Sequence, residues 1–218
     1  VNLALVNEFA LLCERLGVDF SVARGFFGSN ANVYMQPVST NEALQILLEE
    51  AENLNVKLRI SETSIRLCEE ILKHEVELIR DALKNCGKPL RRAKIALLGL
   101  SQTPNTADIP SESVKKIVSI LENKGAKLTL YDPFMSGGTL ADHEPAPFRK
   151  SLVEAVEGTD CIVILAAHDQ FKRLNLRKLK LLAKMPAAIV DLEGILDPLK
   201  VEAEGFIYRG FGRGVWKK

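Results

Sequence analysis

A short apolar run followed by a polar loop and a helix start constrains the fold of this 218-residue chain more than any other stretch. Residues 95–98 are continuously apolar, which is typical of a strand buried on both faces of a sheet. Gly99 ends the run, and a loop rich in Ser, Gln, Thr, Pro and Asn leads to Pro110, a residue type favoured in the first turn of a helix. The stretch therefore predicts a strand, a loop and a helix over about 111–123. In open α/β sheets, ligands bind at this carboxyl edge of the strands.

The chain changes character shortly before this stretch. Up to residue 88 the apolar residues follow helical spacing, with helices expected over 1–16, 41–53 and 62–85. From residue 93, short apolar strands alternate with helices at the spacing of right-handed βαβ units and a parallel sheet. Strands are expected over 95–98, 127–131, 161–166, 187–191 and 206–208. We therefore expect the α/β fold class: an N-terminal all-helical dimerisation domain over residues 1–88, followed by a Rossmann-like parallel α/β domain over residues 89–218.

Composition argues against several classes of protein. The 29 basic and 28 acidic residues nearly balance, so the chain does not have the charge of a polybasic nucleic-acid binder. No apolar run approaches the roughly 18 residues of a membrane span, and no signal peptide is recognisable. Four scattered cysteines indicate reduced thiols in a cytoplasmic protein, with neither a disulfide framework nor a metal site. Because Val1 lies within an amphipathic run, we expect the chain to be a piece of a longer protein.

Five segments carry motifs in a fixed order along the chain. They are Asn7-Glu8-Phe9-Ala10 with Gly17-Val18-Asp19; Gly99-Leu100 with Pro104-Asn105-Thr106-Ala107-Asp108; Tyr131-Asp132-Pro133; His168 with Phe171; and Val190-Asp191-Leu192 with the 208–213 segment. In this order they resemble the UDP-glucose/GDP-mannose dehydrogenase family, the NAD-dependent enzymes that oxidise a nucleotide sugar to a uronic acid. The resemblance covers essentially all 218 residues, as that family's central and C-terminal domains.

The resemblance implies partners and a cofactor. The ligand would be a nucleotide sugar, with a UDP-sugar favoured, and the cofactor would be NAD, for which this chain has no glycine fingerprint. An N-terminal Rossmann domain that would supply NAD is missing from this chain. The resemblance also implies a homodimer formed through the N-terminal helices, and the wide apolar face over residues 1–16 favours self-association.

The chain departs from the family at the positions that carry the chemistry. The family traps an aldehyde on a cysteine thiolate, but residues 28–37 contain no cysteine, and Met35 lies about where that nucleophile would be. Thr103 replaces the lysine of the family's loop, and Pro110 replaces its arginine, which removes two cations from a site for a pyrophosphate. We therefore assign no catalytic residue, and we expect the chain alone to show no NAD reduction with any UDP- or GDP-sugar.

Candidate binding residues remain in the loop after the first strand. There are two interpretations of Thr103, Asn105, Thr106 and Asp108. In the first, they bind a nucleotide through hydroxyls and backbone N–H groups. In the second, they form a polar loop that caps the following helix. His168 ends a predicted strand at the same edge, where it either contacts ligand or, the interpretation we favour, is satisfied by neighbouring backbone.

Two further positions carry alternatives. Asp132 stands where a dinucleotide fold places a ribose-binding acid, but without the glycine fingerprint a turn-forming Asp-Pro is favoured. Arg209 and Arg213 either reach a phosphate or lie in an exposed basic tail, and Arg213 is retained as a substrate-binding candidate. Cofactor-binding residues cannot be named from this chain.

Two functions remain open on the sequence alone. The chain is either the dimerisation and nucleotide-sugar-binding portion of an NAD-dependent dehydrogenase homologue, or a degenerate, non-catalytic module that binds a nucleotide sugar or acts only in assembly.

Overall fold

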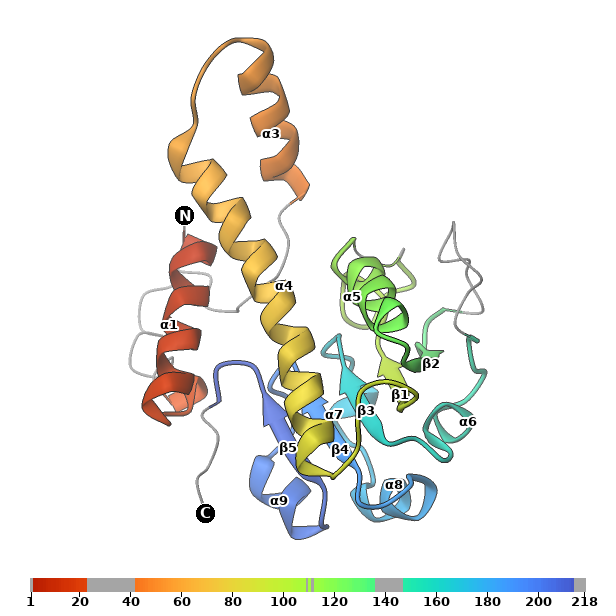
Figure 1. Ribbon diagram of the computed structural model, residues 1–218. Helices are drawn as coiled ribbons and strands as arrows, with labels where there is room; N and C mark the ends of the chain where they lie inside the picture. The colour runs from red at the N-terminus through yellow and green to blue at the C-terminus, as the bar shows by residue number, and fades with distance from the viewer. Residues whose placement is uncertain (1, 23–41, 109, 111, 136–146, 214–218) are drawn as a thin grey trace. The chain divides into compact units, whose positions relative to one another are not determined.

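The computed structural model describes residues 2–22, 42–108, 110, 112–135 and 147–213 (Figure 1). The strands are β1 (Lys94–Leu98), β2 (Lys127–Tyr131), β3 (Cys161–Ile164), β4 (Ala188–Asp191) and β5 (Ile207–Gly210). The helices are α1 (Asn2–Leu16), α3 (Glu42–Asn53), α4 (Arg59–Asn85), α5 (Glu112–Asn123), α6 (Leu152–Val156), α7 (Asp169–Lys172), α8 (Leu176–Leu182) and α9 (Pro198–Ala203).

The five strands form one sheet in the order β2-β1-β3-β4-β5, and every neighbouring pair is parallel. The expected Rossmann-like parallel α/β sheet is therefore confirmed. The order places β1 and β3 side by side at the centre, with Leu98 in register with Ile164. Connections leave β1 toward β2 and β3 toward β4, in opposite directions, so the switch point of this sheet lies between the carboxyl ends of β1 and β3.

Burial on both faces explains why the strands are apolar throughout. All four residues of β3 and of β4 are buried, and so is β1 after Lys94. On one face, alternate strand residues such as Ala96 and Ile162 join a core cluster with side chains from α6 to α9. Helix α5 contacts β2, and the buried residues along one side of this helix include Val114, Ile117 and Leu121. No helix in the described residues has the length and apolar character that a membrane crossing requires.

The chain divides into two compact units. The first combines residues 1–75 with residues 211–218, and the second is residues 76–210, which contain the sheet. In the first unit, Glu14 accepts the Gly212 N–H through Oε1 at 2.7 Å, and its Oε2 lies 2.6 Å from His74 Nε2. The Gly212 carbonyl accepts the Phe20 N–H at 2.8 Å. Gly212 has φ +71°, and a Cβ there would lie 2.8 Å from the Phe20 Cβ, so this close approach requires glycine.

This division corrects the expected fold class. The described residues show no separate N-terminal all-helical domain ahead of the parallel sheet: the first unit incorporates a segment from beyond β5, and α4 contributes to both units. The expectation was wrong because helical spacing reports which face of a helix is buried, not which part of the chain covers it. The domain limits 1–88 and 89–218 stay predictions.

Candidate functional site

The loop after β1 lies at the carboxyl edge of the sheet. Its base is closed by an isolated bridge between Ser101 and Pro110. Gly99, at the start of the loop, donates its N–H to the Tyr131 carbonyl at the end of β2 at 2.9 Å. Gly99 has φ +85°, and a Cβ there would lie 2.8 Å from the Ala166 Cβ and 2.9 Å from the Ala166 nitrogen. The loop therefore begins where the end of β1 lies close to the segment that follows β3.

Asp132, the residue after β2, anchors the start of this loop. Its Oδ2 accepts the N–H groups of Leu100 at 2.7 Å and Ser101 at 3.0 Å, and the Ser101 hydroxyl at 2.9 Å. Its Oδ1 accepts the Phe134 N–H at 2.9 Å, which forms the local Asp turn. Asp132 is 2% exposed, so this carboxylate is a buried tie between β2 and the β1 loop.

The hydrogen bonds keep Asp132 ionised. Burial raises the pKa of its carboxyl, but the N–H groups of Phe134, Ser101 and Leu100 and the Ser101 hydroxyl together hold the pKa below its usual value. A carboxylate with several donors aimed at it is stable as an anion even when water is excluded.

His168 lies against Asp132 and is fully buried. Its Nε2 is 3.2 Å from Asp132 Oδ2, and its Nδ1 accepts the Asn105 N–H at 2.8 Å. Because Nδ1 is an acceptor, the hydrogen-bond network assigns the ring proton to Nε2, which donates to Asp132. The rings of Phe134 and Phe171 each lie 5.3 Å from the imidazole. His168 is thus the buried link between the β2 end and the loop.

Asn105 carries the loop across to α7. Its Nδ2 donates to Asp169 Oδ2 at 3.1 Å, and its Oδ1 accepts the Asp169 N–H at 3.0 Å. The backbone of Asn105 has φ +62°, a left-handed conformation that Asn adopts more readily than most residues. Lys172 in turn pairs with Asp169 at 2.8 Å.

Two of the remaining loop candidates are exposed threonines. Thr103 and Thr106 are exposed, and Asp108 is half-buried. The Thr106 hydroxyl donates to the Thr103 carbonyl at 2.8 Å, and the Thr103 hydroxyl lies 3.4 Å from Asp108 Oδ2. The loop therefore offers polar side chains on a backbone that is fixed from beneath.

The structure brings together most of the predicted site residues. Thr103, Asn105, Thr106, Asp108 and His168 lie in one hydrogen-bonded region of the second unit, and their role in binding stays a prediction. Arg213 belongs to the first unit, where it lies 3.6 Å from Asp19. Met35 falls outside the described residues.

Sequence reasoning missed two residues of this region. Ser101 and Asp169 were not candidates, yet Ser101 binds Asp132 and Asp169 binds Asn105. The available signal was weak: Asp169 follows His168 directly, as an acidic residue in the first turn of α7.

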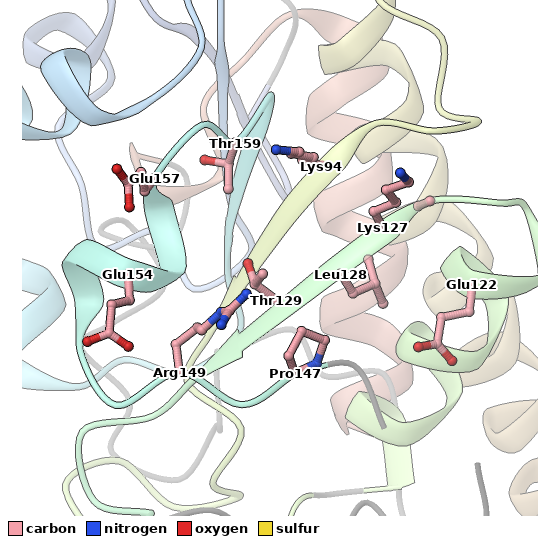
Figure 2. A pocket seen from close by; sticks show the side chains of 11 residues that line it. Lys94, Glu122, Lys127, Leu128, Thr129, Pro147, Arg149, Glu154, Glu157 and Thr159 are labelled. Atoms are coloured by element: carbon pink, nitrogen blue, oxygen red, sulfur yellow. The ribbon is translucent and has the colours of Figure 1, made fainter. Parts of the chain in front are cut away.

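A second feature of the same unit is a groove of about 470 Å³ around the amino ends of β1 and β2 (Figure 2). Its charged lining balances three basic against three acidic side chains: Lys94, Lys127, Arg149, Glu122, Glu154 and Glu157. None of the predicted site residues lines it. Within the described ranges, no three His, Cys, Asp or Glu side chains come together as metal ligands.

The comparisons with known proteins agree on one family. Residues 96–198 match the model of the UDP-glucose/GDP-mannose dehydrogenase family, UDP binding domain. The UDP-N-acetyl-D-mannosamine dehydrogenase of Pyrococcus horikoshii is 30% identical over 98% of this chain and 49% of its own length. The UDP-glucose 6-dehydrogenase of Rhizobium meliloti is 28% identical over 98% of this chain and 50% of its own length. The chain spans about half the length of the curated relatives it matches.

Solved structures give the same result across nearly the whole chain. A UDP-D-ManNAc dehydrogenase structure from Pyrococcus horikoshii has a TM-score of 0.81 at 28% identity, covering 98% of this chain and 49% of that one. An NDP-N-acetyl-D-galactosaminuronic acid dehydrogenase from Methanosarcina mazei Go1 shares the fold at a TM-score of 0.84 and 21% identity, covering 98% and 48%. The expected resemblance is therefore confirmed: the chain is similar over nearly its whole length to nucleotide-sugar dehydrogenases, and residues 96–198 match the model of the UDP-glucose/GDP-mannose dehydrogenase family, UDP binding domain.

Proposed function

We propose that this chain is the nucleotide-sugar-binding portion of a dehydrogenase homologue, and that it takes a UDP-sugar at the loop of residues 101–108. The observation that carries the proposal is the position of this loop. It lies within the segment matched by the family's UDP-binding domain, at the carboxyl edge of a parallel sheet, with Thr103 and Thr106 exposed on it.

The test is calorimetric titration of the chain with UDP, UDP-glucose, UDP-N-acetylmannosamine and GDP-mannose. We expect one of the UDP compounds to bind in the low-micromolar range, about −8 kcal/mol. Absence of heat with all four compounds would overturn the proposal.

A matched pair of variants locates the site. Thr103→Lys adds a cation to the loop, where it can pair with a phosphate, whereas Thr63→Lys adds one to an exposed position of α4 in the other unit. We expect Thr103→Lys to tighten UDP binding up to about fivefold and to make it more sensitive to salt, as for one ion pair added at a solvent-exposed position. Equal effects of the two variants would mean that UDP is not bound at this loop.

A specific observation favours the non-catalytic alternative for this chain alone. Residues 28–37 hold no cysteine, and trapping the aldehyde intermediate requires a thiolate. We infer that NAD, if the whole protein uses it, is held by a part outside this chain, and that the chain alone reduces no NAD with a UDP- or GDP-sugar. Steady NADH production by the purified chain, followed at 340 nm, would contradict this inference.

The four free cysteines support a cytoplasmic location.

We also propose that the chain self-associates through α1. Phe9, Leu12 and Leu16 are spaced along one side of this helix and are 43%, 51% and 67% exposed. Leu12→Glu is expected to shift a dimer toward monomer in light scattering after size exclusion, whereas Leu181→Glu, at an 86% exposed position of α8, is not. A monomeric wild-type chain would refute a homodimer.

A further inference from the structure

One residue joins the loops that follow the two central strands. Asn105 lies in the loop after β1, and it makes three hydrogen bonds to His168 and Asp169, which follow β3. We refer to Asn105, His168 and Asp169 as the latch. Because β1 and β3 are neighbours whose connections leave in opposite directions, the latch spans the switch point at which a sheet of this kind takes its ligand.

The His168 side of the latch is rigid. The imidazole is 0% exposed, contacts Asp132 Oδ2 at 3.2 Å and lies 5.3 Å from each of the Phe134 and Phe171 rings. Asp132 is itself fixed by backbone donors from Leu100, Ser101 and Phe134. The lone pair of His168 Nδ1 therefore has one direction available, toward the Asn105 N–H at 2.8 Å.

The loop side would not hold this conformation on its own. Asn105 has φ +62°, which is costly for a residue with a side chain and is maintained only by surrounding contacts. Its backbone N–H contacts His168, and its side-chain amide pairs with Asp169 in both directions. These bonds fix the backbone at a position between the exposed residues Thr103 and Thr106.

The latch orders the loop without covering it. Thr103 and Thr106 are exposed while the latch is formed, so a ligand reaches their hydroxyls without breaking it. A loop that is already in its binding conformation avoids the entropy cost of ordering when the ligand arrives. The latch therefore orders the loop before the ligand binds, and it does not have to open for the ligand to enter.

We propose that His168 is a positioning residue: its Nδ1 accepts the Asn105 N–H and thereby holds the 101–108 loop in the conformation that binds the nucleotide part of the ligand. The proposal rests on the function proposed above, since the loop is taken as the binding element. It assigns His168 no contact with the ligand.

Two variants of His168 separate its two hydrogen bonds. His168→Asn places an amide oxygen where Nδ1 lies, so it keeps an acceptor for Asn105 but loses the donor to Asp132. His168→Gln places an amide nitrogen where Nε2 lies, so it keeps the donor to Asp132 but loses the acceptor for Asn105. Both replace a fully buried ring by a smaller amide, and the shorter Asn leaves the larger gap, so a loss of packing alone would harm His168→Asn more than His168→Gln.

The first measurement needs no ligand. Amide hydrogen exchange of Asn105 is expected to speed up at least tenfold in His168→Gln and to change little in His168→Asn. Calorimetry with UDP is then expected to show about fivefold weaker binding for His168→Gln, the loss typical of one neutral hydrogen bond, and recovery toward wild type for His168→Asn. A purely structural role would lower the stability of both variants without this difference between them.

The outcomes distinguish the latch from the proposed function. If the wild-type chain binds no UDP, the proposed function fails, while the exchange rates still decide whether Nδ1 holds the loop. If UDP binds wild type but both variants bind it equally, the positioning role is overturned. Where the His168 variants do not fold, Asn105→Gly serves instead: it tolerates the positive φ, removes both bonds to Asp169, and is expected to accelerate exchange in the loop and to weaken UDP binding. Unchanged exchange and binding in Asn105→Gly would overturn the latch.

Discussion

Replacing the buried carboxylate of Asp132 by an amide tests the electrostatic centre of the site. In Asp132→Asn, the side-chain oxygen that takes the place of Oδ2 keeps the donors of Leu100, Ser101 and His168, but it is neutral. The new NH₂ group then faces the Phe134 N–H, so two donors meet where an acceptor and a donor met before. Hydrogen bonds to a charged acceptor contribute about 1 kcal/mol more than neutral ones, and a buried unmatched donor costs about 1–3 kcal/mol. The neutral amide also avoids the cost of burying a charge, which offsets part of these losses, so we expect a total loss of about 3 kcal/mol in the free energy of unfolding.

The pH dependence of this loss is a sharper test than its size. The folded pKa of Asp132 lies below its usual value of 3.8, so its contribution is fully present above pH 3.8 and is lost as the pH falls through the folded pKa. The difference between wild type and Asp132→Asn should therefore be largest at pH 7 and shrink in acid, where the wild-type carboxyl is also neutral. Urea unfolding followed by circular dichroism at a series of pH values measures it.

Asp197→Asn is the matched control for this prediction. Asp197 is exposed and caps α9 by accepting the Leu199 N–H at 3.0 Å. Asn caps helices about as well as Asp, so this variant should change stability by less than about 0.5 kcal/mol. A loss below about 1 kcal/mol in Asp132→Asn at pH 7, or an equal loss at all pH values, would refute the reasoning about the ionised carboxylate.

Three other substitutions have expected outcomes that urea or thermal unfolding can check. Gly99→Ala should destabilise the fold by about 2–3 kcal/mol, because its Cβ would lie 2.8 Å from Ala166 Cβ; Gly17→Ala, also at positive φ but with nothing within 4 Å, should cost only about 1 kcal/mol, and equal losses would argue against the close approach. Lys88→Met removes the ion pair with Asp160 at 2.8 Å and the bond to the Lys184 carbonyl, and should cost about 1–2 kcal/mol at neutral pH; no loss would show that water replaces the lysine. Burial and the nearby Asp191 raise the pKa of Glu193 to about 7, so wild type loses stability as pH rises from about 4.5 through about 7. Glu193→Gln should therefore be more stable than wild type at pH 8 by about 3 kcal/mol and not at pH 4, and a pH-independent difference would contradict the assignment.

The sheet was predictable because its signal is local. A strand buried on both faces must be apolar at every position, so runs such as Ile95 to Leu98 identify it directly, and the parallel arrangement follows from the helices between the runs. The sequence also indicated the loop of residues 101–108, since the carboxyl edge of such a sheet is where loops carry polar residues.

The contacts that build the site were not predictable in the same way. Asn105 and His168 are 63 residues apart, and they meet because β1 and β3 are neighbours in the sheet order, which strand spacing alone does not determine. Asp132 forms the turn that its Asp-Pro sequence suggests, but its four further hydrogen bonds come from Leu100, Ser101 and His168. A single sequence shows the Asp-Pro turn at Asp132, but it does not show that the distant β1 loop will donate hydrogen bonds to this carboxylate.

The composition of the first unit constrains the order in which the protein assembles during synthesis. Glu14 and Gly212 are 198 residues apart, and every strand of the sheet is translated between them. Domains generally fold as they emerge from the ribosome, so the sheet unit has all of its residues before the segment that α1 contacts has been made. During that interval α1 lacks the hydrogen bond that Glu14 accepts from the Gly212 N–H. The first unit can therefore be completed only after Gly212 has been synthesised.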